Sequence, residues 1–165
     1  MKVKFDVNLE PKHIFKFNMY QSYRSMQGIL SLALPALIFT RLYMQYQQME
    51  LSQILMFLGV GILFLVYVPI SLWLSAKKAF QKNSVLASTL HFEFTEQNIC
   101  VTQGVDKAEF KWENIYKMVS TKDLVLIYTN RINAYVIPKL QAGMEYVELA
   151  KLANMKLDKS RVQLR

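Results

Sequence analysis

The stretch ILMFLGVGILFLVYVPISLWLSA fills residues 54–76 without a single charged side chain. As an α-helix, a run of this length extends about 34 Å, slightly more than the hydrocarbon core of about 30 Å in a bilayer. A helix of a soluble domain rarely reaches such a length without a polar stripe. The stretch therefore predicts a transmembrane helix.

A second apolar run, GILSLALPALIFT, fills residues 28–40 and is followed by Arg41. A long arginine side chain near a helix end reaches the membrane interface, and tyrosines such as Tyr43 and Tyr46 favour the same depth. We predict a first transmembrane helix over residues 26–46, kinked at Pro35. A re-entrant or interfacial segment is the alternative.

The segment between the two runs is short and polar, so residues 47–53 are expected to form an external loop. The two helices then make an antiparallel hairpin, in which Gly59 and Gly61 allow close approach of the first helix. Glycine is also common in membrane helices for no such reason. The remaining domains are an N-terminal strand with an amphipathic segment over residues 1–25 and a C-terminal domain over residues 77–165.

The formal net charge of +8 lies mostly beside the apolar runs. Residues 1–25 and 54–83 each carry a net +3, whereas residues 26–53 are neutral and residues 84–165 carry +2. The positive-inside rule then puts both termini in the cytoplasm, at the inner cell membrane. A nucleic-acid-binding protein would concentrate its positive charge on the soluble domain, so nucleic acid is not an expected partner.

Five basic residues flank the predicted helices: Arg24, Arg41, Lys77, Lys78 and Lys82. In the simpler interpretation they only anchor the helix ends. In the second they also contact anionic headgroups, at about 1 kcal/mol for each basic residue near the surface. The two interpretations are compatible, and the sequence leaves both open.

Beyond residue 82 the pattern changes to short alternating segments separated by turn residues. In the segment HFEFT, Phe92 and Phe94 share one face, and the segment LVLIY at residues 124–128 is apolar on both faces, as in a central strand. Six such segments predict an antiparallel meander. Residues 143–157 then show helical spacing, and the last eight residues read as a basic polar tail.

The expected fold class is therefore a membrane α-helical hairpin plus an α+β domain. That domain would be a small antiparallel β-roll closed at one end by a C-terminal helix. The alternating residues 3–9 lie on the same side of the membrane in this topology, and we predict that they join the sheet.

Two motifs, FKWENI at residues 110–115 and AYVIPK at residues 134–139, give the chain a resemblance to the YcxB-like family of bacterial membrane proteins. Trp112, Ile115, Pro138 and Lys139 match the family pattern and are expected to be structural. The resemblance implies a two-helix hairpin and a C-terminal domain similar to bacterial pleckstrin-homology-like (PH-like) domains. It implies no established enzyme activity and no defined site.

The residues themselves suggest no catalytic or metal centre. His13 and His91 lie in separate segments without a carboxylate pair at ligand spacing, and Cys100 is the sole cysteine. No nucleophile elbow or phosphate-binding glycine loop is present in the sequence. We expect no enzyme activity, no cofactor and no metal.

Three functions compete at this stage. The first is a membrane-anchored interaction domain that binds a protein, a peptide or an anionic headgroup, for instance by β-strand addition. The second is an envelope-stress or bacteriocin-immunity type of membrane protein, by analogy of architecture alone. The third is an oligomeric transporter component. The bilayer is the expected partner, with another membrane or cytoplasmic protein as a further hypothesis; the oligomeric state and physiological role are open.

Overall fold

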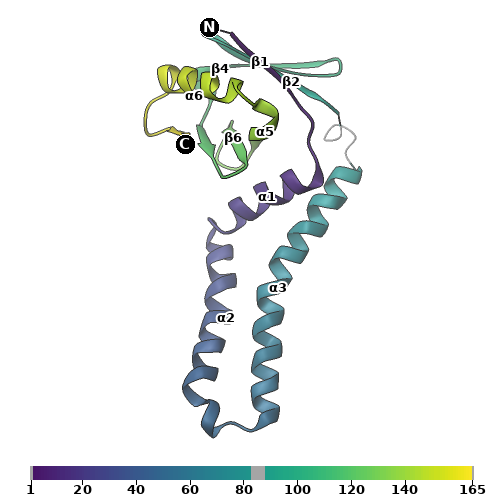
Figure 1. The fold of residues 1–165 in the computed structure, drawn as a ribbon, viewed down its shortest axis with the longest axis vertical. Coiled ribbons are helices and arrows are strands. Elements are labelled where there is room, and N and C mark those ends of the chain that lie inside the picture. The colour runs from purple at the N-terminus through teal and green to yellow at the C-terminus, as the bar shows by residue number, and fades with distance from the viewer. Residues whose placement is uncertain (1, 83–87, 165) are drawn as a thin grey trace. The chain divides into compact units, whose positions relative to one another are not determined.

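The computed structural model describes residues 2–82 and 88–164. The chain forms two compact units, a β domain built from Met1–Ile14 with Ala79–Arg165 and a helical unit of Phe15–Lys78. The β domain is thus discontinuous in sequence, because the helical unit is inserted after its first strand (Figure 1). Each unit is described separately.

The β domain contains two sheets of four strands each. The strand orders are β1-β2-β3-β4 and β7-β6-β5-β8. The strands are β1 (Lys2–Val7), β2 (Leu90–Thr95), β3 (Asn98–Gln103), β4 (Asp106–Lys111), β5 (Lys117–Ser120), β6 (Leu124–Tyr128), β7 (Ala134–Pro138) and β8 (Val162–Gln163). The 3₁₀ turn η2 (Trp112–Asn114) joins the sheets, and helices α5 (Lys139–Ala142) and α6 (Glu145–Lys156) follow β7.

The N-terminal strand joins the first sheet, as predicted. β1 pairs antiparallel with β2 from Lys2 opposite Thr95 to Val7 opposite Leu90. Val3, Phe5 and Val7 are buried, whereas the alternate positions Lys2, Lys4 and Asp6 are exposed. Strict alternation of this kind belongs to a strand with one face on the core and one in water.

Asn8, directly after β1, ties together three parts of the β domain. Its Oδ1 accepts a hydrogen bond of 2.7 Å from Oγ1 of Thr89, which directly precedes β2. Its backbone N–H donates to Oε1 of Gln141 in α5 at 2.7 Å, and its carbonyl accepts from Nε2 of the same side chain at 2.9 Å. The residues directly after β1 and directly before β2 are therefore held together.

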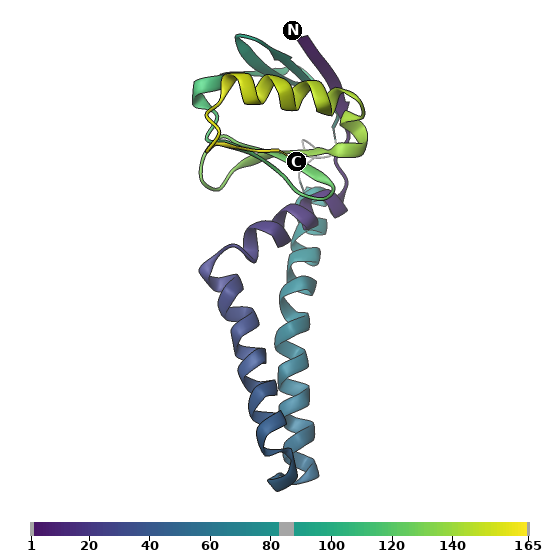
Figure 2. The same cartoon turned by 60° about the vertical axis from the view of Figure 1, so that its left-hand side comes forward.

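The core lies between the two sheets. Phe92 and Phe94 are buried on one face of β2, and all five residues of β6 are buried, as expected for a central strand. Helix α6 lies along one open side of the two sheets (Figure 2), and its Leu149 and Leu152 are completely buried. Each such leucine contributes about 1.5–3 kcal/mol relative to an exposed one.

Tyr135 of β7 connects the aromatic residues of the two sheets. Its ring lies edge-on to Phe92 at 5.9 Å and to Phe110 of β4 at 5.7 Å, measured between ring centroids. Edge-to-face pairs of this kind add about 0.5–1.5 kcal/mol beyond the area that they bury. Burial raises the pKa of the Tyr135 phenol.

Two parts of the predicted β-roll were wrong. The last residues are not a free basic tail, because β8 pairs with β5 in parallel, from Met118 opposite Val162 to Val119 opposite Gln163. The second sheet is therefore mixed whereas the first is wholly antiparallel, and the strands form two sheets instead of one continuous meander. The short helix α5 was also missed, since four residues are too few to show a period.

The helical unit contains most of α1 (Pro11–Ser22), then α2 (Met26–Gln45), the 3₁₀ turn η1 (Tyr46–Gln48) and most of α3 (Leu51–Lys82). The spans Met26–Gln48 and Leu51–Lys82 are long and apolar enough to cross a membrane. α2 and α3 run in opposite directions on either side of η1 (Figure 1), as the predicted hairpin requires. Pro35 lies inside α2, and α3 continues beyond residues 54–76 at both ends.

One of the two glycines in α3 has the predicted role. A Cβ atom at Gly61 would lie 2.6 Å from the ring of Phe39 in α2, so the glycine makes room for that ring. Beyond its chain neighbours and the adjacent backbone of its own helix, no described atom lies within 4 Å of a Cβ at Gly59. Nearer the turn, the guanidinium of Arg41 lies 6.0 Å from the ring of Phe57, within cation–π range.

Candidate interaction surfaces

The apolar surface of the hairpin is the largest candidate surface. Both long helices expose big hydrophobic side chains along their length, for example Leu37 at 67% and Leu63 at 63% exposure. Monomeric soluble proteins rarely expose apolar patches beyond a few hundred Å². The hairpin therefore needs an apolar environment, either lipid or protein.

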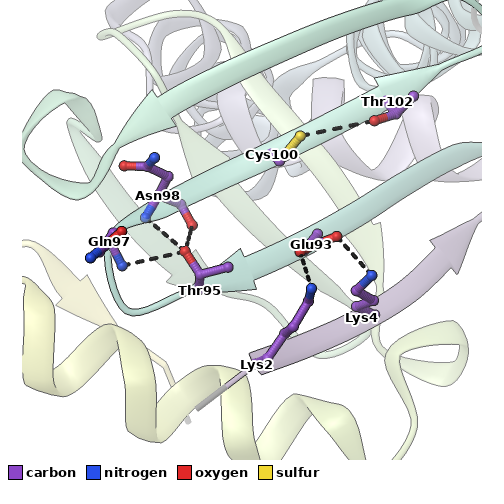
Figure 3. Close-up of polar contacts among 8 residues, drawn as sticks. All are labelled: Lys2, Lys4, Glu93, Thr95, Gln97, Asn98, Cys100 and Thr102. Carbon is purple, nitrogen blue, oxygen red and sulfur yellow. Dashed lines mark hydrogen bonds and ion pairs between the residues drawn. The ribbon is translucent and has the colours of Figure 1, made fainter.

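The outer face of the first sheet is polar and connected by ion pairs (Figure 3). The Glu93 carboxylate accepts from Nζ of Lys2 at 2.6 Å and from Nζ of Lys4 at 2.8 Å. The hydrogen bond from Lys2, followed by that from Lys4, lowers the pKa of Glu93 to about 2. The same contact raises the pKa of Lys4. These pairs hold β1 against β2 on the solvent side.

The histidine and the cysteine of this face lie among ordinary surface contacts. Nδ1 of His91 is 2.6 Å from Oδ1 of Asp6, its partner across the β1–β2 ladder, and both side chains are exposed. Cys100 is half-buried, and its Sγ lies 3.9 Å from Oγ1 of Thr102. Within residues 2–82 and 88–164, no three His, Cys, Asp or Glu side chains gather as a metal site would require.

The edges of the two sheets differ in how they are covered. The β5 edge is occupied by β8, while β1 and β7 contact α5. Among the described strands, β4 forms backbone hydrogen bonds only with β3. Gln103 and Asp106 are opposite each other beside the β3–β4 turn, where an antiparallel ladder begins with a hydrogen-bonded pair. Hydrogen-bonded and non-hydrogen-bonded pairs then alternate, so the backbone N–H and C=O groups of Lys107, Glu109 and Lys111 point away from β3. β4 is thus an edge with donors and acceptors available to another strand.

The flanking basic residues singled out in the sequence all lie on the helical segments or next to them. Arg24, between α1 and α2, places its guanidinium 5.3 Å from the ring of Tyr20. Arg41 lies near the turn end of α2. Lys77 and Lys78 are exposed within α3, and Lys82 is its last residue.

The four residues of the family pattern all lie in the β domain, where they make packing or polar contacts. Trp112 is buried, and its Nε1–H donates to the carbonyl of Thr95 at 2.9 Å. Ile115 is buried beyond η2, and Pro138 closes β7 opposite Leu124. Lys139 begins α5, and its Nζ lies 5.0 Å from the ring of Tyr146.

Sequence reasoning missed the residue that holds the C-terminal segment. The guanidinium of Arg161 donates to the carbonyls of Tyr116 at 3.1 Å, Glu113 at 3.0 Å and Ile115. The carbonyl of Arg161 accepts from the N–H of Met118 at 2.8 Å. Nothing in the sequence distinguishes this arginine from the other basic residues of the segment.

A family model described as YcxB-like protein matches residues 94–145. The matched segment runs from the end of β2 to the start of α6 and contains both motifs, so the predicted resemblance is confirmed there. No curated protein and no solved structure matches the chain.

Proposed function

We propose that this chain, with its YcxB-like segment, is a membrane-anchored protein that presents a PH-like interaction domain at the inner face of the cell membrane. One observation carries the proposal: an exposed apolar hairpin is inserted between two neighbouring strands of the β domain. The order of two sheets followed by a covering helix supports the PH-like assignment. No enzyme activity forms part of the proposal.

The insertion point supports a topology with both termini on one side. Val7 at the end of β1 lies opposite Leu90 at the start of β2, and Asn8 bonds Thr89. A chain that leaves and re-enters one domain at adjacent points must cross a bilayer an even number of times. Two spanning helices satisfy this requirement, and the basic flanks favour the cytoplasm for the β domain.

Labelling with a membrane-impermeant maleimide tests the anchor and its direction. In a Cys100→Ser background, single cysteines replace Gln47 in the turn and Val105 in the β3–β4 turn, where the side chain is fully exposed. We expect Gln47→Cys to react in intact spheroplasts and Val105→Cys only after lysis. Release of the protein by alkaline carbonate, or labelling of the Val105→Cys variant from outside, would contradict the proposal.

The partner of the β domain is proposed to be an extended protein segment that adds to β4. The support is that no described strand pairs with the outer side of β4, whereas the β5 edge is already filled by β8. Main-chain hydrogen bonds would supply the affinity in such a complex. The Lys107 N–H is one of the donors that point outward from this edge.

A substitution that removes a backbone N–H tests the proposed strand addition at β4. A photo-cross-linking residue at position 105 should capture a partner in cells, and Lys107→Pro should abolish the product by removing an edge donor. Lys107→Ala is the matched control, since it removes the same charge and keeps the N–H. Equal cross-linking in the two variants, with protease resistance showing both folded, would refute strand addition at β4.

A further inference from the structure

The charges of the helical unit are concentrated at one end of the hairpin. Within Phe15–Lys78 the sole acidic residue is Glu50, beside the turn, where Arg41 balances it. The four other charged residues are Lys16, Arg24, Lys77 and Lys78. They all lie before α2 or towards the end of α3, and they are all exposed. The start of α2 and the end of α3 lie away from the turn that joins the two helices (Figure 1).

Aromatic rings occupy the same end. Phe15 of α1 lies edge-on to Trp73 of α3, with the ring centroids 5.4 Å apart. Lys77 follows Trp73 by one helical turn and so shares its face of α3. Basic and amphipathic aromatic side chains gathered at one helix end are typical of the headgroup region of a membrane.

The connection between α1 and α2 is a tightly bonded corner. Ser25 is the N-cap of α2, and its Oγ accepts from the N–H of Gly28 at 3.2 Å and donates to the carbonyl of Ser22 at 2.6 Å. A Cβ atom at Gly28 would lie 2.0 Å from that same carbonyl oxygen. The corner therefore holds α1, with Lys16 on it, at a defined angle to α2.

We propose that this basic collar, defined as Lys16, Arg24, Lys77 and Lys78, binds the phosphate groups of anionic phospholipids around the hairpin. The occupant is lipid because the collar continues directly into the exposed apolar surfaces of α2 and α3, as at Leu30 and Leu74. Four exposed cations at one end of the unit match the charge of an anionic leaflet. This inference rests on the proposed membrane anchor.

Trp73 offers an internal probe of the lipid next to the collar. The chain has two tryptophans, and Trp112→Phe leaves Trp73, whose side chain is 42% exposed, as the sole fluorophore. The full chain is reconstituted in phosphatidylcholine vesicles containing 20% brominated phosphatidylglycerol or 20% brominated phosphatidylcholine, on the order of the anionic content of a biological leaflet. We expect the anionic lipid to be preferred near Trp73 by about fivefold or more.

Charge-neutralising variants complete the test. Replacing all four collar residues with glutamine (Lys16→Gln/Arg24→Gln/Lys77→Gln/Lys78→Gln) should abolish the preference for anionic lipid. Replacing only the first two (Lys16→Gln/Arg24→Gln) should reduce it. The matched control neutralises four exposed cations of the β domain: Lys122, Lys151, Lys156 and Lys159. It should keep the preference, and 0.5 M salt should weaken it as screening lengths fall to a few Å.

Equal quenching by the two brominated lipids would overturn the collar while leaving the anchor intact. Loss of the preference in the β-domain control alone would also overturn it. Absence of quenching by either lipid would show that Trp73 is not in a bilayer, which would overturn both the collar and the anchor. The two proposals are thus distinguishable.

Discussion

Gly28 packs against Ser22 so closely that a Cβ atom added to Gly28 would lie 2.0 Å from the Ser22 carbonyl oxygen. The obstacle is backbone, which cannot rotate away as a side chain can. The α1–α2 corner therefore depends on a glycine at this position, although Gly28 has an ordinary negative φ and no turn signal marks it in the sequence.

Gly28→Ala should destabilise the helical unit by about 1–3 kcal/mol, the usual cost of overpacking. Gly59→Ala is the matched control, because open space surrounds that position and alanine favours a helix. Thermal unfolding of the full chain in detergent would compare the two. A Gly28→Ala midpoint at or above that of Gly59→Ala would contradict the described corner.

The ion pairs of Glu93 should make the stability of the β domain depend on pH. The folded state lowers the pKa of Glu93 from 4.5 to about 2, so the unfolded state binds the proton more readily. The contribution is therefore fully present above pH 4.5 and is lost as the pH falls through about 2. Denaturant midpoints of wild type and Glu93→Gln should differ at pH 6 and converge near pH 2; a constant difference would refute the assignment.

Arg161→Ala should free β8 from the edge of β5. The guanidinium satisfies the carbonyls of Glu113 and Tyr116, and its loss leaves these acceptors to water. Hydrogen exchange at the Met118 amide, which donates to the Arg161 carbonyl, should then be at least tenfold faster. Lys159→Ala, an exposed position of the same segment, should leave that amide unchanged; equal exchange in the two variants would contradict an anchoring role.

Two substitutions of Trp112 should separate the contribution of its hydrogen bond from that of its packing. Trp112→Phe removes the hydrogen bond to Thr95 but keeps an aromatic ring beside Phe94, at a cost of about 1 kcal/mol. Trp112→Ala also empties the packed site, and we expect a cost of about 3–5 kcal/mol. Pulse proteolysis in denaturant measures both, and similar losses in the two variants would show that packing contributes little.

The pattern of consecutive residues was enough to predict the elements in which burial repeats regularly along the chain. The apolar runs of α2 and α3 and the alternation of β1 and β2 are properties of consecutive residues, so hydropathy and a period of two identify them. The same pattern placed Phe92 and Phe94 on one face of their segment, and both are buried in the core. The interactions that depend on partners distant in sequence were not accessible in this way.

The sequence by itself therefore determined that this chain has an apolar hairpin and a β domain, and at which end of the hairpin the positive charge lies. Only the tertiary structure decided that the strands before and after the hairpin, β1 and β2, are neighbours, and that Asn8 bonds Thr89 and Gln141 beside them. It also decided that Arg161 binds the carbonyl of Tyr116, directly before β5, and that β4 pairs only with β3 among the described strands. The physical reason is that burial follows local periodicity, whereas hydrogen bonds between residues far apart in sequence depend on the register that the complete fold selects.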